Sequence, residues 1–337
     1  MADAFETARF VSINRKNELR SGWRVLAFIV LSYLSMLVIG SLIASIGSFV
    51  PSLGRLLIQS ADSEGASPDA VAAFLIREGI PLLAVLFATA VCARALEHRT
   101  FASVGFKRHR GFIRDFGLGS LVGAASIGIG ILIEVAAGAA KFSPSGRGAL
   151  ELVLSFMLLF PMFLIAAAFE ELFFRGFAFQ ALVCDAGPAL AIAITSAGFG
   201  LLHLANPNGS FLSTVNTILA GIWLSLAYLK TRSLWLPTGL HCAWNLAMVF
   251  LFGLPVSGLS GFTGIGLLHG SGKQPLWISG GGYGPEGGIA ATVAIVIAIL
   301  IVWKSPLFSA TDEMIEAIKH GRAEPRFLSI VNPPSDE

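Results

Sequence analysis

Apolar stretches of about twenty residues recur along this chain, and each could cross the roughly 30 Å hydrocarbon core of a bilayer as a helix. Charged residues make up only 13% of the chain, against about 25% in an ordinary soluble domain. Since lipid offers no partners to backbone polar groups, such runs must form helices whose hydrogen bonds are internal. We therefore predict an all-α membrane bundle of about eight transmembrane helices, at 24–46, 79–96, 117–138, 149–172, 187–205, 212–229, 234–253 and 287–303.

Lysines and arginines indicate the orientation, because they are retained on the cytoplasmic side. With the N-terminus inside, only 5 of the 23 basic residues fall in outer segments, and the other 18 (23 less 5) fall in inner ones. The outer five are Arg55, Arg77, Lys141, Arg147 and Lys273. We expect an integral, multi-pass protein with both termini in the cytoplasm and the bilayer as its surroundings. A net charge of +2 gives no reason to expect a nucleic-acid partner.

Five regions follow from this pattern. They are a cytoplasmic N-terminal segment (1–23), three helices with a basic loop (24–148), a central core (149–255), a Gly-rich loop with the last helix (256–303), and a cytoplasmic tail (304–337). The first apolar run is longer than a signal-peptide core, which favours an uncleaved anchor. The Gly-rich stretch 254–286 lies outside the membrane and could cover a cavity or merely connect; we interpret it as a connector, since glycine-rich loops usually just connect. The tail begins with the helical pattern "TDEMIEAIKH".

Three charges interrupt the fourth apolar stretch in the motif "EELFFR". An ionisable group at membrane depth costs roughly 2.5 kcal/mol or more, so it is retained when paired or used. Glu171 and Arg175 are four residues apart and can pair along one helix face, which a structural role explains well. Glu170 lies about 100° around the helix. It is the carboxylate left without a local cation, and a candidate for proton chemistry.

Two histidines and an asparagine lie within later spans. His203 ends "FGLLH" one turn after Phe199, and His241 opens "HCAWN" one turn before Asn245. A single membrane histidine or asparagine usually just links helices by hydrogen bonds, and we assign Asn216 such a packing role. The conjunction of these groups with Glu170 on three spans instead indicates a functional site. Straight spans would, however, place His203 and His241 near opposite ends of the bundle.

Two chemistries suit these groups. Glu170 and His203 could hold and deprotonate a water while His241 and Asn245 stabilise an oxyanion. Alternatively, Glu170, His203 and His241 could ligate Zn²⁺, which would activate the water. The spacing is not that of an HExxH metalloprotease. The three cysteines have no CxxC spacing and imply neither a disulfide framework nor a cysteine metal site, and Cys242 points away from the face of His241, so covalent catalysis is the weaker case.

Read in order, these motifs are EExxxR, FxxxH and HxxxN, and over residues 149–255 they resemble the CPBP family of intramembrane proteases. This family includes type II CAAX prenyl endopeptidases and bacterial proteins of bacteriocin processing and immunity. The resemblance implies an intramembrane endopeptidase, in a bacterial cytoplasmic membrane, that hydrolyses a membrane-associated or prenylated-type peptide. It implies that Glu170 is the catalytic acid/base, supported by Glu171 and Arg175. His203 then completes the water or metal site, and His241 with Asn245 binds the oxyanion or a metal.

Two other classes of function use the same residues. A proton-coupled transporter would employ Glu170, Arg175 and the histidines as a relay, which would have to continue through other spans. The first three spans offer few polar residues, and no internal repeat typical of transporters is visible. A catalytically silent scaffold or immunity protein is the third class, against which the intact motifs argue.

Overall fold

A computed structural model describes residues 19–58 and 68–319. It confirms the all-α membrane bundle. The helices are α2 (Ser21–Phe49), α3 (Pro51–Ile58), α4 (Pro68–Leu96), α5 (Phe112–Ala136), α6 (Ala149–Arg175), α7 (Phe177–Ala186), α8 (Pro188–Leu202), α9 (Phe211–Thr231), α10 (Trp235–Leu246), α11 (Leu276–Ser279), α12 (Ile289–Lys304) and α13 (Asp312–Lys319). Short 3₁₀ turns and a π turn (Ala247–Leu251) complete the helical part. Most of the expected N-terminal segment and the end of the tail, with His320, lie outside the described residues.

The only two strands in the described part of the chain form a small sheet. Strand β1 (Ala140–Pro144) pairs antiparallel with β2 (Leu268–Gly272), so that Ala140 faces Gly272 and Pro144 faces Leu268. Lys273 N also donates to Ala139 O at 2.7 Å. This pairing fastens the Gly-rich stretch to the connection between α5 and α6.

All eight predicted apolar stretches are largely helical, but their lengths differ from the prediction. Among the described residues, six helical segments are long and apolar enough to span a membrane. The seventh predicted span is the 12-residue α10 followed by a π turn, and the eighth is the 16-residue α12. At 1.5 Å per residue these two helices are about 18 and 24 Å long, shorter than the hydrocarbon core. In contrast, α4 begins at Pro68, well before the predicted start at residue 79.

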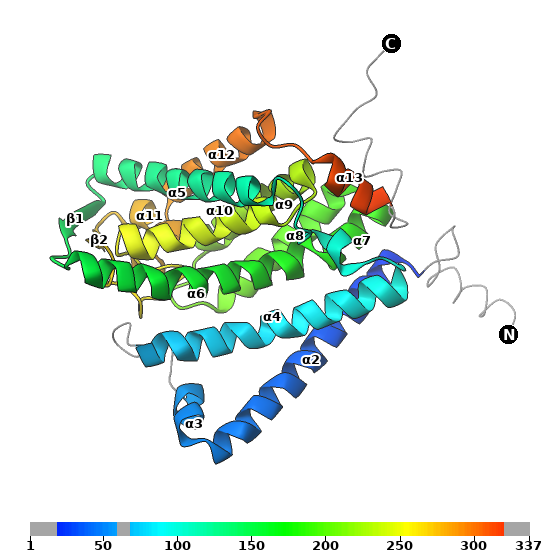
Figure 1. The fold of residues 1–337 in the computed structure, drawn as a ribbon. Coiled ribbons are helices and arrows are strands. Elements are labelled where there is room, and N and C mark those ends of the chain that lie inside the picture. Colours follow the sequence, from blue (N-terminus) through cyan, green and yellow to red (C-terminus); the bar gives the residue numbers. More distant parts are fainter. Residues whose placement is uncertain (1–18, 59–67, 320–337) are drawn as a thin grey trace, which may run out of the picture.

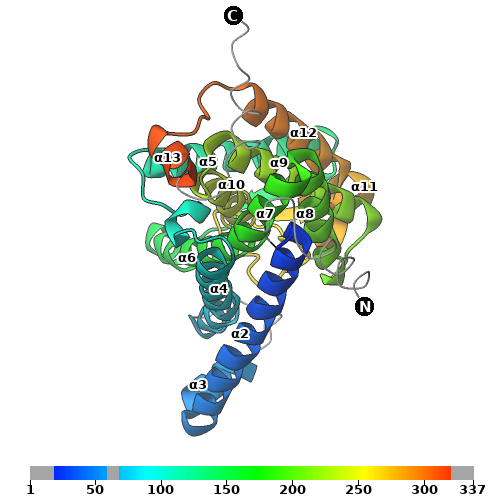
Figure 2. The same ribbon diagram turned by 90° about the vertical axis from the view of Figure 1, so that its right-hand side faces the viewer.

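Helix α10 occupies the centre of the bundle, packed against α5, α6 and α9 (Figure 1). The later part of α2 and helix α3 project away from the remaining helices, as Figure 2 shows, whereas α2 packs against α4 and α7 nearer its start. The start of α2 and the tail helix α13 lie at one end of the bundle and the β1–β2 sheet at the other (Figure 1). The site described below is built around the central helix.

Glycines in α5 let α10 approach its backbone closely. A Cβ atom on Gly123 would lie 2.2 Å from Leu240 O, and one on Gly119 would lie 2.4 Å from Leu236 O. Any side chain there would displace α10. Small residues at a membrane helix crossing permit this close backbone contact, and here they position the helix that carries His241.

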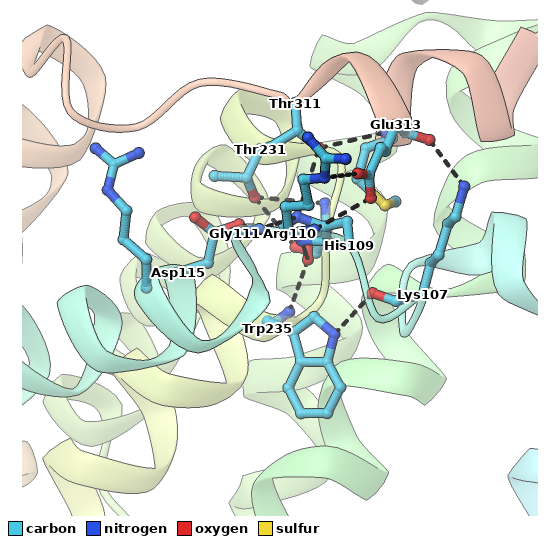
Figure 3. Close-up of polar contacts among 12 residues, drawn as sticks. Lys107, His109, Arg110, Gly111, Asp115, Thr231, Trp235, Thr311 and Glu313 are labelled. Carbon is cyan, nitrogen blue, oxygen red and sulfur yellow. Dashed lines mark hydrogen bonds and ion pairs between the residues drawn. The ribbon is translucent and has the colours of Figure 1, made fainter.

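The predicted tail helix forms as α13 and docks on the loop between α4 and α5 (Figure 3). Arg110 N donates to Glu313 Oε2 at 3.1 Å, and Lys107 Nζ donates to Glu313 O at 3.2 Å. Thr311 Oγ1 lies 3.4 Å from Nδ1 of the buried His109. Trp235 Nε1, at the start of α10, donates to Lys107 O at 3.1 Å. One loop thus contacts both the tail and the central helix.

Candidate active site within the membrane bundle

The predicted pair between Glu171 and Arg175 forms in the last two turns of α6. Arg175 Nη1 donates to Glu171 Oε1 at 3.1 Å, and neither side chain has any solvent exposure. Arg175 Nη2 donates to Gly221 O of α9 at 3.1 Å. Helix α6 ends directly after this pair, because the backbone of Gly176 leaves the helical conformation before α7 begins. The pair therefore ties the end of α6 to α9.

His241 of α10 contacts both adjacent glutamates. Its Nδ1 atom lies 2.9 Å from Glu171 Oε1, and its Nε2 atom lies 3.7 Å from Glu170 Oε2. Since an ionised carboxylate only accepts hydrogen bonds, Nδ1 carries a proton and donates it to Glu171. Nε2 is thereby directed toward Glu170. Glu170 Oε2 is buried and receives no hydrogen bond from the described residues.

Phe199 brings the second histidine to the same place. His203 Nδ1 lies 2.8 Å from Phe199 O and donates to this carbonyl, which leaves Nε2 as the acceptor of the neutral ring. The Phe199 ring lies 4.6 Å from the His203 ring and 6.0 Å from the His241 ring, and the Arg175 guanidinium stacks 4.7 Å from it. Each distance is measured to ring centroids. Phe199 therefore packs among all three polar side chains.

The expectation that His203 and His241 lie near opposite ends of the bundle is wrong. Helix α8 has 15 residues and rises by only about 22 Å, so His203 at its end stays within the bundle. Helix α10 is also short, and His241 lies in the middle of it. Both histidines line two common cavities with Asn245. The prediction assumed full-length spans, but α8 and α10 are shorter, and the His203 and His241 rings therefore lie at the same cavities.

The larger cavity has a volume of about 630 Å³ and extends from these residues to α2 and α4. Its wall is largely apolar, with Glu170, His203, His241 and Asn245 at one part of it. A smaller cavity of about 30 Å³ adjoins the two histidines and Asn245, which is room for a water molecule. All four predicted catalytic residues thus line the large cavity, which has room for an extended apolar molecule, and three of them also line the small one.

Arg77 and Glu78 also line the large cavity, and sequence reasoning assigned Arg77 to an outer loop. Both lie within α4, where Arg77 Nε is 3.5 Å from Glu78 Oε1 and its guanidinium lies 5.1 Å from the Phe74 ring. The predicted span began after these charges because hydropathy falls there. The helix continues upstream to Pro68. A helical pattern followed that far in the sequence could have placed Arg77 and Glu78 inside this helix.

The Gly-rich stretch is not a mere connector, contrary to our expectation. Its residues Val256, Ser257, Leu259 and Phe262 line the large cavity, and Ser257 and Glu286 line the small one. Burial, together with the nearby Glu286 carboxylate, raises the pKa of Tyr283 to about 12, so this phenol stays protonated at neutral pH. The stretch therefore forms part of the walls of both cavities.

The hydrogen bonds of Asn216 on α9 agree with the packing role assigned to it. Its Nδ2 atom donates to Glu286 O and Gly288 O, each at 2.8 Å, and its Oδ1 atom accepts from Thr292 Oγ1. The side chain thereby holds the segment that leads into α12.

Glu170, His203 and His241 are residue types that can ligate zinc, which accepts neutral imidazole and carboxylate ligands. In the part of the chain that the structure describes, however, no three His, Cys, Asp or Glu side chains gather around one point. We therefore derive no step through a metal. The three cysteines, all within the described residues, form no disulfide, and Cys242 is buried in the core while its neighbour His241 faces the cavity.

The fold and site define a multi-pass helical membrane protein with ionisable side chains gathered at a cavity inside the bundle. Residues 152–247 match the family model described as type II CAAX prenyl endopeptidase, Rce1-like. This match agrees with the predicted resemblance over that segment, which contains Glu170, Glu171, Arg175 and both histidines. The comparisons with curated proteins and with solved structures found no match.

Proposed function

We propose that this protein is an intramembrane endopeptidase that cleaves a peptide bond with a water activated by Glu170. The observation that carries this proposal is the contact of Glu170 with His241, 3.7 Å apart on α6 and α10, at a largely apolar cavity. Both residues fall within the segment that matches a prenyl endopeptidase family. A carboxylate beside an imidazole at a cavity that can admit water is the arrangement that general base catalysis needs.

Glu170 acts as the base and then as the acid. A water donates one hydrogen to Glu170 and the other to His203 Nε2, which leaves an oxygen lone pair free to attack the peptide carbonyl carbon. Glu170 takes the first proton as the carbon–oxygen bond forms. When the carbon–nitrogen bond breaks, Glu170 returns this proton to the leaving amine. No covalent intermediate with the protein is formed.

The oxyanion of the tetrahedral intermediate faces α10. Asn245 donates from its side-chain amide, and His241 donates from Nε2 when that atom carries a proton. Glu171 orients His241 by accepting the hydrogen bond from Nδ1 at 2.9 Å. Donors fixed before the reaction stabilise developing charge because the protein need not reorganise around it.

The substrate class follows from the cavity and the family together. A largely apolar space of about 630 Å³ between α2, α4 and α6 suits a lipid-modified or hydrophobic peptide segment. The matching family is named for CAAX prenyl substrates. We therefore propose a membrane-associated, prenylated-type peptide as the substrate. We also propose that both termini face the cytoplasm, on the basis of the basic residues.

Purified protein in liposomes tests the proposal. It should cleave a farnesylated CAAX peptide faster than the same peptide without the lipid, and Glu170→Gln protein should not cleave either. Mass spectrometry of the products gives the bond that is broken. Wild-type protein that leaves both peptides intact would refute the proposed activity on this substrate class.

Proton-coupled transport is a second candidate function, and the position of Arg77 and Glu78 favours it. These residues extend the set of charges in the cavity from α6 to α4, as a relay requires. Transport predicts proton flux into liposomes that depends on Glu78 as well as Glu170. A pH-sensitive dye trapped in the liposomes measures this flux, which hydrolysis alone would not produce.

A further inference from the structure

Glu286, at the end of the Gly-rich stretch, has a carboxylate whose two oxygens both accept hydrogen bonds from neutral donors. Its Oε1 atom accepts from Trp244 Nε1 at 2.9 Å. Its Oε2 atom accepts from Ser257 N at 2.7 Å and from Ser257 Oγ at 2.8 Å. Hydrogen bonds to an ionised carboxylate are shorter and roughly twice as strong as neutral ones. This group therefore joins α10 firmly to both ends of the stretch.

The main chain at Glu286 is held from a third side. Asn216 of α9 donates to Glu286 O and Gly288 O. A Cβ atom on the neighbouring Gly284 would lie 2.2 Å from Pro255 O, so the two ends of the stretch touch closely. These contacts hold the main chain at Glu286 independently of the hydrogen bonds that its side chain forms with Trp244 and Ser257.

The residues that Glu286 holds belong to the cavity wall beside the proposed reaction centre. Trp244 directly precedes Asn245 and lies three residues after His241 on α10. Trp244, Ser257 and Glu286 line the small cavity together with both histidines. The Trp244 ring is further held against Trp223, with ring centroids 5.8 Å apart. Any rotation of α10 about its axis would break the bond to Glu286.

We propose that Glu286 is a positioning residue for the proposed hydrolysis, and this inference rests on that function. It acts through Trp244 to set the rotation of α10, and hence the direction in which His241 and Asn245 point. Through Ser257 it holds the Gly-rich stretch against the cavity as its wall. Glu286 itself takes no proton from substrate and touches no reacting atom.

The variant Glu286→Gln tests this role with little change of shape. An amide accepts at one end only, so either Trp244 or Ser257 faces an NH₂ group and loses its acceptor. Glu151→Gln is the matched control, since Glu151 is exposed at the start of α6, where it accepts from Gly148 N at 3.1 Å. Trp244→Phe keeps the ring and removes only the N–H, and provides an independent second variant.

Two measurements separate the outcomes. Hydrogen exchange of residues 254–260 should accelerate in Glu286→Gln and not in Glu151→Gln. For a farnesylated CAAX peptide, kcat should fall by about 10- to 100-fold in Glu286→Gln and Trp244→Phe, as expected for a small misplacement of reacting groups. KM should change less than kcat, because the walls of the large cavity on α2, α4 and α6 are untouched and only the part formed by the Gly-rich stretch loosens. Glu151→Gln should stay within about twofold of wild type.

The results that would overturn the inference are distinct from those that would overturn the function. If wild-type protein cleaves the peptide and Glu286→Gln is as active per folded molecule as Glu151→Gln, the positioning role is wrong and the function stands. Unchanged exchange at 254–260 in Glu286→Gln would refute the anchoring even without any cleavage. Wild-type protein that cleaves nothing while exchange accelerates as expected would overturn the proposed function and leave the anchor established.

Discussion

Oxygen Oε1 of Glu171 accepts from His241 Nδ1 at 2.9 Å and from Arg175 at 3.1 Å. Glu171 and Arg175 are four positions apart on α6, whereas His241 lies 70 positions after Glu171 along the chain. Glu171 is therefore at once half of a buried ion pair and the group that orients the histidine beside Glu170. The two adjacent glutamates consequently have separable roles, which single substitutions can distinguish.

Glu170→Gln should slow hydrolysis by orders of magnitude without unfolding the protein. The amide keeps the shape of the side chain but cannot take a proton from water, so we expect kcat to fall by about 10²- to 10⁴-fold. The thermal unfolding midpoint should stay close to that of the wild type, because Glu170 forms no buried ion pair with a lysine or arginine among the described residues. Cleavage of the farnesylated peptide beside a melting curve measures both. A fully active Glu170→Gln protein would assign the base to another group.

Glu171→Gln should lower both stability and specific activity. It leaves the fully buried Arg175 without its carboxylate, and breaking a buried pair from one side costs roughly 3–5 kcal/mol. Changing Arg175 to Met as well should restore part of the melting temperature. It should not restore activity, because His241 still lacks the carboxylate that orients it. A double variant that regains full activity would show that Glu171 serves stability alone.

Removal of divalent metals should leave cleavage intact. The described residues gather no three ligands around one point, so we expect the protein to remain active after dialysis against a strong chelator. Elemental analysis of the purified protein should find well below one zinc per chain. One equivalent of zinc that is lost together with activity in His203→Ala and His241→Ala would establish a metal site instead.

Gly123→Ala should destabilise the bundle while Gly128→Ala should not. The new Cβ atom at residue 123 would lie 2.2 Å from Leu240 O, whereas nothing lies within 4 Å of one at residue 128. Overpacking costs about 1–3 kcal/mol, and the added methyl group otherwise favours a helix by about 1 kcal/mol. Both residues lie in α5, so the comparison isolates the contact with α10. Equal melting temperatures in detergent would contradict the packing.

The tail helix should loosen at acidic pH through His109, which lies between Asp115, Ser233 and Thr311 (Figure 3). Burial lowers the pKa of His109, and Lys107 adds to this while Glu313 opposes it. The folded state therefore binds the proton more weakly than the unfolded chain, whose histidine pKa is about 6.5. The stability that neutral His109 contributes is complete above about pH 6.5 and is lost as the pH falls below it.

Hydrogen exchange of residues 312–318 measures this loosening. It should be faster at pH 5.5 than at pH 7.5 after correction for the intrinsic rate, and His109→Gln should remove the difference. His269→Gln, which changes an exposed histidine of β2, is the control and should behave as the wild type. A pH effect that persists in His109→Gln would assign it to another group.

Much of the site can be derived from sequence because its parts are local. Helical spacing predicts the pair of Glu171 with Arg175 and leaves Glu170 apart, and the pair is present. The same spacing puts His241 and Asn245 on one face, and both line the cavities. Hydropathy locates all eight apolar helices, although it places the start of α4 too late. Charges near a helix end lower the mean hydropathy, so Arg77 and Glu78 were assigned outside the span.

The sequence by itself determined the all-helical membrane fold, the local ion pair and the identity of the candidate groups, since each depends on residues within a few turns of one helix. Only the tertiary structure decided that His203 and His241 line the same cavities, that Glu171 holds His241, and that the Gly-rich stretch forms part of the cavity wall. These outcomes depend on helix length and on close backbone contacts such as that at Gly123, between segments far apart in the chain. Hydropathy and helical spacing describe one segment at a time, whereas contacts between segments arise from packing in three dimensions.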